Sequence, residues 1–438
     1  MRFAICTLGC KVNQYESQAM QTLLEARGHT AVSPEDPAEL YIINTCSVTA
    51  VSDKKSRQTI RRLRRANPEA VLAVCGCYAQ AAAEQVVALG VDVISGTGQR
   101  TVFLDKCVEA VATRQRWVSV DDALRRRGYE LLPAGGLEGR TRAMLKVQDG
   151  CRNFCTYCII PYTRGALRSE PLEDAVAQAK ALAAEGYREI VLTGIEIASW
   201  GEEWKNGMAL IDLLEALCRA VPGLRVRLGS LEPRVITEGF CLRAAKLENL
   251  CPHFHLSLQS GCDATLKRMN RRYDTARFLE SCALLRRHFH RPAITTDLIV
   301  GFPGETEEEF QTTLAFLERA GFAAMHIFPY SRRPGTPADR MPDQISRAEK
   351  ERRAHAAAAA ADALERQWLT SLIGTVQSVL LEERREGLWR GHAPNYAEIW
   401  VDTPGEWHNV LCSVEVTELA DGKLMGRMWA GQDEKSEK

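Results

Sequence analysis

The chain has 438 residues, of which 45% are hydrophobic and 26% are charged, and its 56 basic side chains balance its 56 acidic ones. This composition is ordinary for a globular protein, and it excludes a disordered chain, a collagen and a coiled-coil rod. Because the formal net charge is zero, a polyanionic partner must be held by local basic patches. The sequence has no apolar run of about 18 residues and no N-terminal export signal, so we expect a cytoplasmic protein without a membrane span.

The first part of the chain alternates between strand and helix patterns. Strands are predicted at 3–6, 40–43, 70–74 and 91–94, and helices at 13–28, 53–66 and 79–89, the first opened by a capping box of Asn13 and Glu16. This alternation predicts an α/β fold, with an open parallel α/β domain over residues 1–118. Residues 119–142 lose the periodicity, so we predict a linker or a connecting hairpin there.

The alternation resumes at residue 143. Strand patterns fall at 143–147, 189–192, 225–228, 253–258, 294–300 and 324–328, and an alanine-rich helix pattern covers 346–370. These strands are fewer than the eight of a closed (β/α) barrel, so residues 143–370 are expected to form a partial, open (β/α)6 barrel. Short β patterns between 374 and 428 predict a small β-barrel of the oligonucleotide-binding kind over 371–438.

Cysteine is the informative residue type, because 15 thiols in a chain without an export signal should be reduced and able to bind metal. Cys151, Cys155 and Cys158 form a C-x3-C-x2-C motif directly after the first strand of the second α/β unit. Three such thiolates can hold three irons of a four-iron cluster and leave the fourth iron open to a substrate or cofactor. The alternative is a structural zinc site completed by His253 or His255.

A second set of cysteines is spread over the first domain. Cys10, Cys46 and Cys77 each follow a predicted strand, at the carboxyl edge where parallel sheets bind ligands. We expect them to converge on a second cluster, although each alone could be a buried apolar residue. Cys75 competes with Cys77 for the third position, because both flank Gly76.

Four segments carry a family resemblance: 7–17 (TLGCKVNQYES), 44–49 (NTCSVT), 76–80 (GCYAQ) and 151–161 (CRNFCTYCIIP). Together they resemble the radical S-adenosylmethionine (SAM) methylthiotransferase family over essentially the whole chain. The family has an N-terminal methylthiotransferase domain, a radical SAM domain and a C-terminal TRAM barrel. Its glycine before the third N-terminal cysteine favours Cys77. The run Gly-Cys-Lys-Val-Asn at 9–13 resembles the branch that methylthiolates carbon 2 of N6-threonylcarbamoyladenosine at position 37 of transfer RNA (tRNA).

The resemblance implies an enzyme with two [4Fe-4S] clusters, each held by three cysteines, and two uses of SAM, one for radical generation and one for methyl donation. Cys151, Cys155 and Cys158 would hold the catalytic cluster, and Cys10, Cys46 and Cys77 the cluster that supplies sulfur. The family pattern places SAM binding at Tyr157, Thr193, Gly194, Glu196, Gln259, Asp297 and Gly301, with Gln259 and Asp297 at strand ends. It also implies a tRNA substrate and a reductant protein of the flavodoxin or ferredoxin type, and we expect a monomer.

The evidence for RNA contact is a basic helix, although such a helix can also be an ordinary solvated face. The residues concerned are Lys54, Lys55, Arg57, Arg61, Arg62, Arg64 and Arg65. Residues 373–438 hold 7 basic and 12 acidic side chains, which is unusual for an RNA-binding barrel. Two alternatives stay open: a methylthiotransferase for isopentenyladenosine-37 of tRNA or for a ribosomal-protein aspartate, and a non-catalytic iron–sulfur or zinc RNA-binding protein.

Overall fold

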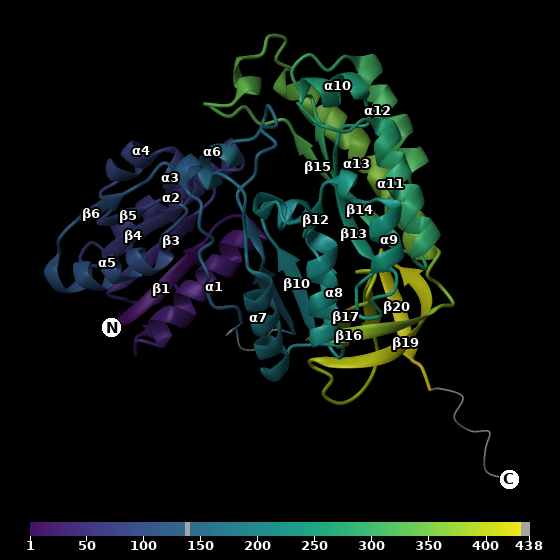
Figure 1. Cartoon of the computed structure of the whole chain (residues 1–438), viewed down its shortest axis with the longest axis horizontal. Coiled ribbons are helices and arrows are strands. Elements are labelled where there is room, and N and C mark those ends of the chain that lie inside the picture. Colours follow the sequence, from purple (N-terminus) through teal and green to yellow (C-terminus); the bar gives the residue numbers. More distant parts are fainter. Residues whose placement is uncertain (136–140, 431–438) are drawn as a thin grey trace.

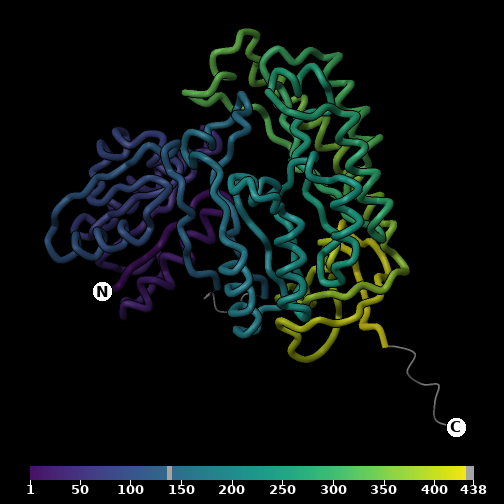
Figure 2. The backbone as a smooth tube through the Cα atoms, viewed as in Figure 1, coloured from purple at the N-terminus to yellow at the C-terminus, as the bar shows by residue number. Residues whose placement is uncertain are grey.

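The computed structural model describes residues 1–135 and 141–430, which form a parallel sheet with helices, an open barrel and a small closed barrel (Figure 1). The backbone trace places the open barrel between the other two parts, with the N-terminal sheet on its left and the closed barrel beneath it (Figure 2). The predicted α/β fold class is confirmed. Among the described residues, no helix is long and apolar enough to cross a membrane.

The N-terminal sheet has six parallel strands in the order β2-β1-β3-β4-β5-β6. The strands are β1 (Arg2–Thr7), β2 (Thr30–Ala31), β3 (Leu40–Thr45), β4 (Val71–Gly76), β5 (Val93–Ser95) and β6 (Trp117–Ser119), and the helices are α1 (Lys11–Glu25), α2 (Ala50–Ala66), α3 (Cys77–Ala81), α4 (Ala83–Val87) and α5 (Arg100–Thr113). Strands β3 and β4 are buried along their whole length, because separate apolar cores cover the two faces of the sheet. The strand order reverses between β1 and β3, and a crevice for a ligand is expected at the carboxyl ends of these two strands.

Several local predictions for this sheet are wrong. Helix α1 begins at Lys11 with Cys10 as its N-cap, so the predicted capping box of Asn13 and Glu16 does not form. The Asn13 amide instead donates to the carbonyl oxygens of Leu8 at 2.8 Å and Thr45 at 3.0 Å, which ties the loops after β1 and β3 together. The helix predicted over 79–89 is two short helices, α3 and α4. Strands β2 and β6 were not predicted, because two or three residues are too short for a periodic pattern.

The open barrel contains the six predicted strands, each within two residues of its expected bounds. They are β7 (Arg142–Lys146), β10 (Glu189–Thr193), β11 (Arg225–Leu228), β13 (His253–Gln259), β14 (Ala293–Val300) and β15 (Ala324–Pro329). A break after β11, followed by β12 (Ser230–Leu231), divides them into the sheets β7-β10-β11 and β12-β13-β14-β15. Within the described residues, β7 and β15 each lack a second neighbour, so the barrel stays open between them.

Helices cover the outer face of this barrel and pack on its large apolar core (Figure 1). They are α7 (Leu172–Ala184), α8 (Leu210–Ala220), α9 (Glu238–Ala244), α10 (Asp263–Arg268), α11 (Thr275–His288), α12 (Glu307–Ala320) and α13 (Arg347–Thr370). After β7, the antiparallel pair β8 (Gln148–Asp149) and β9 (Arg168–Ser169) brackets the cysteine motif and α6 (Ile160–Arg164). The alternating strands and helices leave the inner face of the barrel for polar side chains.

The C-terminal strands close into the predicted five-stranded barrel, in the order β16-β17-β18-β20-β19. They are β16 (Val376–Arg385), β17 (Leu388–His392), β18 (Glu398–Val401), β19 (Val410–Ala420) and β20 (Lys423–Met428). This barrel docks on the amino ends of the open-barrel strands. Arg225 donates to the carbonyl oxygens of Ser378 at 2.5 Å and His392 at 3.1 Å, and Arg227 donates to that of Pro394 at 2.8 Å. The docking therefore lies at the end opposite the cysteine loop.

The segment after β6 connects the sheet to the barrel. Leu132 packs against Tyr15 and Ala19 of α1, and the Tyr15 hydroxyl donates to the Leu132 carbonyl oxygen at 2.5 Å. Residues 120–135 form no strand, so the described part of the predicted linker is a connector and not a hairpin. Residues 136–140 of this predicted linker, and residues 431–438 of the predicted C-terminal domain, lie outside the described part of the chain.

Candidate functional site

The cysteine motif lies at the carboxyl end of the first barrel strand. Gly150, directly before it, has a φ of +78°, and a Cβ there would lie 1.8 Å from the Ala166 carbonyl oxygen, so only glycine fits this turn. The turn leads into the motif, where the Cys151 amide donates to the Gly165 carbonyl oxygen at 3.0 Å. The sequence fixes the spacing of the cysteines, and this turn directs them to the end of the barrel.

Two thiols of the motif, those of Cys151 and Cys158, are neutral in the absence of a metal. Burial raises the pKa of Cys151 to about 12, with a further contribution from the nearby Glu196 carboxylate, and burial together with Cys155 raises the pKa of Cys158 to about 12. A guanidinium N–H of Arg271 donates to the Cys155 sulfur at 3.2 Å. Metal binding must therefore displace protons, and Arg271 supplies a hydrogen bond and a positive charge to one thiolate.

Glu196, one of the predicted SAM ligands, lies close to the cysteine motif. It lies in the loop after β10, next to Thr193 and Gly194 as predicted, and its backbone N–H donates to Gln148 Oε1 at 2.7 Å. The Asn153 amide donates to Glu196 Oε2 at 3.2 Å, whereas the buried Oε1 has no hydrogen-bond partner among the described residues. Burial, reinforced by Glu232, raises the pKa of Glu196 to about 7. A buried carboxylate oxygen without a donor, beside the cysteine motif, could accept a hydrogen bond from a ligand ammonium group such as that of SAM.

The other predicted SAM residues differ in position. Gln259 is the last residue of β13 and has a φ of +68°. The Tyr157 ring packs edge-on against the Phe302 ring, with 6.4 Å between the ring centroids. Gly301 follows β14, and a Cβ there would lie 2.4 Å from Lys350 Cγ, so the packing of α13 accounts for this glycine.

Asp297 does not lie at a strand end, and that prediction is wrong, because β14 continues to Val300. Its carboxylate lies on the inner face of the barrel, 3.3 Å from His255 Nε2 and 3.2 Å from His326 Nδ1. Asp297 is therefore set back from the strand end that carries Gly301.

Cys10, Cys46 and Cys77 converge at the crevice predicted from the strand order. Gly9 has a φ of +107°, and a Cβ there would lie 2.6 Å from Cys46 Cβ and 2.8 Å from its sulfur, so the loops after β1 and β3 are in direct contact. Gly76 has a φ of +98° and turns the chain from β4 directly into α3, which begins at Cys77. The two glycines before cysteines are thus what lets these loops meet.

Cys77 and Cys75 have different neighbours, although burial raises the pKa of both thiols to about 11. Burial raises the pKa of the Cys77 thiol to about 11, Arg164 opposes this shift, and the thiols of Cys10 and Cys46 add to it. Cys75 lies within β4 and packs in the apolar core with Cys107, on another side of the sheet. Cys77 therefore faces Cys10 and Cys46, as the family resemblance indicates, and Cys75 is a core residue.

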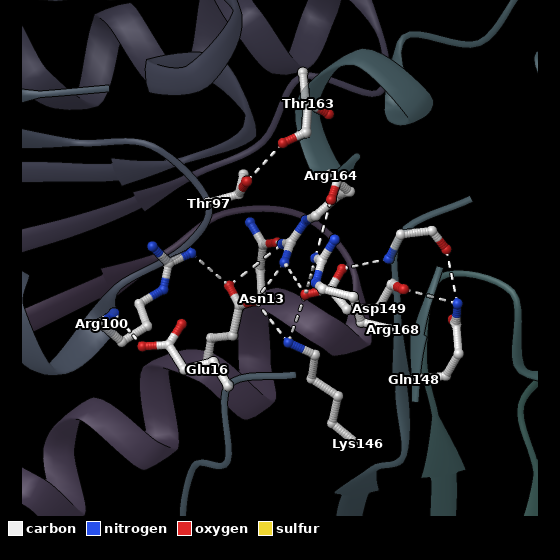
Figure 3. A network of polar contacts seen from close by, with 12 residues as sticks. Asn13, Glu16, Thr97, Arg100, Lys146, Gln148, Asp149, Thr163, Arg164 and Arg168 are labelled. Carbon is white, nitrogen blue, oxygen red and sulfur yellow. Dashed lines mark hydrogen bonds and ion pairs between the residues drawn. The ribbon is translucent and has the colours of Figure 1, made fainter. Parts of the chain in front are cut away.

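Behind these cysteines lies a buried polar network at the junction of the sheet and the open barrel (Figure 3). Glu16 contacts Arg100 at 2.8 Å, Lys146 at 3.3 Å and Arg164. Asp149 contacts Lys146 at 2.7 Å, Arg164 at 3.5 Å and Arg168 at 3.6 Å. The network holds four cations and two carboxylates, so its surplus positive charge suits the anionic thiolates next to it. No local sequence pattern predicts this network, because its members are spread between residues 16 and 168.

The geometry does not match the alternative of a zinc site. The sulfurs of two cysteines bound to one tetrahedral zinc lie about 3.8 Å apart, given a Zn–S distance of about 2.3 Å. Within residues 1–135 and 141–430, the only three such ligand atoms that all lie within 4.8 Å of one another belong to His255, Asp297 and His326. Neither cysteine triad is gathered around a single-ion position, whereas a cluster needs its thiolates farther apart.

The predicted RNA-binding helix is α2, and not all of its basic residues are available. Arg64 donates to the Gly90 carbonyl oxygen at 2.8 Å and pairs with Asp92, and Arg57 donates to the Tyr78 hydroxyl at 3.3 Å. The exposed basic residues without a bonded partner among the described residues are Lys54, Lys55, Arg61, Arg62 and Arg65. These five form the candidate phosphate-binding surface.

Comparison with known proteins first defines the class. Residues 145–317 match the model described as the radical SAM superfamily, and residues 2–96 match the one described as uncharacterized protein family UPF0004. The structure of TsrM, a radical SAM methyltransferase from Kitasatospora setae, aligns with a TM-score of 0.57 at 17% identity, covering 77% of this chain and 75% of that chain. The fold and the cysteine motif are those of a radical SAM enzyme.

Relatives then specify the family. The threonylcarbamoyladenosine tRNA methylthiotransferase MtaB of Bacillus subtilis is 40% identical and covers 90% of this chain and 89% of its own. That of Thermotoga maritima is 36% identical over 92% of each chain. The tRNA-2-methylthio-N(6)-dimethylallyladenosine synthase of Novosphingobium aromaticivorans is 34% identical over 97% of each chain. This chain belongs to the radical SAM methylthiotransferase family.

Proposed function

We propose that this protein transfers a methylthio group to carbon 2 of N6-threonylcarbamoyladenosine at position 37 of tRNA. The observation that carries the proposal is the similarity to enzymes named for this base, at 40% and 36% identity over nearly the whole chain. The two cysteine triads, which lie in separate parts of the structure, support a reaction that needs both a radical and a sulfur source. No side chain is basic enough to activate the C–H bond at carbon 2, so cofactors must do so.

We propose two [4Fe-4S] clusters, one on Cys151, Cys155 and Cys158 and one on Cys10, Cys46 and Cys77. When bound, they and SAM supply the one-electron chemistry and the sulfur. Basic residues of the chain would stabilise the negative charge of both cysteine triads. Arg271 donates to the Cys155 sulfur, and the buried cations behind Cys77 offset the negative charge of the second triad. The unpartnered oxygen of Glu196 would accept a hydrogen bond from the SAM ammonium group.

The tRNA would be held mainly by the N-terminal sheet domain. The exposed cations of α2 follow the loop that carries Cys46, so phosphate contacts there would bring the anticodon loop to the second triad. The C-terminal barrel contributes less charge, because Arg390 pairs with Glu383 and Glu398, and Arg427 pairs with Glu415. The proposal further includes a flavodoxin or ferredoxin as reductant, a monomeric state, the domain limits given above and action in the cytoplasm, where tRNA is modified.

The test starts with iron content after anaerobic reconstitution, in the wild type and in two triple alanine variants, one for each cysteine triad. About eight irons in the wild type and about four in each variant would support two four-iron clusters. Each protein is then incubated with SAM, a reductant and tRNA that carries threonylcarbamoyladenosine, and the nucleosides are analysed by mass spectrometry. Methylthiolation by the wild type alone supports the proposal.

The same assay with tRNA that carries isopentenyladenosine tests the second candidate, which the dimethylallyladenosine synthases among the relatives favour. A protein that modifies only this tRNA would refute the substrate proposed here. A protein that never cleaves SAM under reducing conditions would instead be a non-catalytic iron–sulfur protein.

A further inference from the structure

A cavity of about 510 Å³ lies on the inner face of the open barrel, where the N-terminal sheet domain and the C-terminal barrel meet it. Its lining includes Lys11 at the start of α1, Met144 and Val191 of the barrel strands, His253 of β13, and Tyr396 of the C-terminal barrel. The volume is within the range of small-molecule sites and is large enough for a modified nucleoside. No residue predicted to bind SAM lines this cavity, so it is separate from the SAM site at the strand ends.

Most charges around the cavity are neutralised within the protein. Arg142 pairs with Glu382 at 3.1 Å, and Arg385 pairs with Glu383 at 3.1 Å. Arg227, which also lines the cavity, pairs with Glu189 at 2.6 Å and donates further hydrogen bonds to carbonyl oxygens of the C-terminal barrel.

His253 is uncharged, because burial, with Arg227 beside it, holds its pKa well below the ordinary value. None of the titratable groups named so far therefore leaves a free charge in the cavity.

Lys11 is different. Its side chain is exposed to the cavity, and it has no hydrogen bond or ion pair with any residue that the structure describes. Its charge contributes to the lowered pKa of His253, which lines the same cavity. In the described part of the chain, the cavity lining therefore carries one uncompensated positive charge. A ligand that brings one negative charge is complementary to it.

We propose that Lys11 binds the carboxylate of the threonylcarbamoyl group and so selects this base over adenosines with neutral N6 substituents. The inference rests on the proposed function, because it takes the substrate from there. In adenine, carbon 2 and the carbon that bears N6 both adjoin N1, so the reacting carbon and the N6 substituent lie on the same side of the ring. Cys10 and Lys11 are consecutive, so the same short segment would bring the second cysteine triad to carbon 2 and the Lys11 ammonium group to the N6 substituent.

The same lysine would reject a hydrocarbon arm. A dimethylallyl group in this cavity offers no acceptor, so it would cover the Lys11 ammonium group without pairing it, which is unfavourable. The three arginines of the lining are each already paired with a carboxylate, so they compete less well than Lys11 for a ligand carboxylate. Selection therefore depends on a single side chain.

The test compares two anticodon stem-loop RNAs on the reconstituted holoenzyme. One carries the threonylcarbamoyl group with its carboxylate, and the other carries the neutral threoninamide analogue. The variants are Lys11→Gln, Lys11→Arg and, as a matched control on a distant surface, Lys246→Gln. The quantity measured is the ratio of kcat/KM for the acid to kcat/KM for the amide. Because both RNAs are tested on the same preparation, partial loss of folding or of iron cancels in this ratio.

We expect the wild type and Lys246→Gln to prefer the acid by about 10- to 100-fold, the range of a charge-assisted hydrogen bond. The ratio should fall to near one in Lys11→Gln and largely persist in Lys11→Arg. A Lys11→Gln variant that keeps the wild-type ratio overturns the role of Lys11 and leaves the proposed function intact. A wild type that uses both RNAs equally also overturns the role of Lys11 and leaves the proposed function intact. A wild type that modifies neither RNA refutes both the role of Lys11 and the proposed function.

Discussion

Replacing Glu16 with glutamine keeps the shape of the side chain and removes one of the two carboxylates from the junction network (Figure 3). Glu16 is only 1% exposed and contacts three of the four buried cations, Arg100, Lys146 and Arg164. After the replacement, Asp149 would be the only carboxylate left in the network, and it contacts Lys146, Arg164 and Arg168 but not Arg100. Loss of one partner from a buried ion pair typically costs about 3–5 kcal/mol, because the remaining charge has no compensation. We expect a loss of that size in the free energy of unfolding.

The assay is urea unfolding of the metal-free protein, followed by circular dichroism. The matched control is Glu109→Gln, which breaks an exposed pair with Lys106 and should cost less than about 1 kcal/mol. A Glu16→Gln variant that loses no more than this control would refute the conclusion that the network joins the two parts of the chain.

The pH dependence of this loss gives a second check. Burial alone would raise the pKa of Glu16, but the charges of Arg100, Arg164 and Lys146 hold it well below its ordinary value of 4.5. The carboxylate therefore stabilises the folded state fully above pH 4.5, and this contribution is lost as the pH falls below that value. The difference between wild type and variant should shrink in acid, and a difference that grows there would contradict the assignment.

Three further predictions follow from single residues. In Gly9→Ala the new Cβ would clash with Cys46, so the variant should lose about half of the reconstituted iron. The control Gly223→Ala, where no atom lies near the new Cβ, should bind as much iron as the wild type. Equal iron content in both variants would refute the convergence of the loops. Burial, with a neighbouring carboxylate, raises the pKa of Glu170 to about 8 from an ordinary 4.5, so the folded state loses stability as the pH rises from 4.5 to 8. Glu170→Gln should remove this loss, so its free energy of unfolding in urea, compared with the wild type, should be roughly 3 kcal/mol higher at pH 8 than at pH 5. An equal effect of the substitution at both pH values would show that the Glu170 carboxyl is not protonated in the folded state. Arg271→Met removes a hydrogen bond and a charge from a ligand sulfur, so the reduction potential of the cluster in the C-x3-C-x2-C motif should fall in a redox titration followed by electron paramagnetic resonance, and an unchanged potential would count against that contact.

The local sequence determined the elements and the chemistry of this protein. Hydrophobic periodicity located the six strands of the open barrel and the five of the closed one, because strands alternate or are buried on a scale of a few residues. The spacing of Cys151, Cys155 and Cys158 indicated a cluster with an open iron, since all three ligands lie on one loop. The positions of Cys10 and Cys46 after strands indicated a second site at the sheet edge.

The tertiary structure decided which residues the cysteines and the basic side chains contact. The convergence of Cys10, Cys46 and Cys77 depends on the strand order β2-β1-β3-β4, which no local pattern encodes. Arg271 reaches Cys155 across 116 residues of chain, and Arg64 proved to be used inside the fold although it looked like its exposed neighbours.

The charge state of each site also needed the fold, because it depends on which partners burial brings within a few ångströms. Lys11 reads in the sequence as one basic residue in a motif. Only the packing of the sheet domain against the two barrels, in which the nearby arginines find carboxylates and Lys11 does not, makes it the free cation of the cavity among the residues that the structure describes.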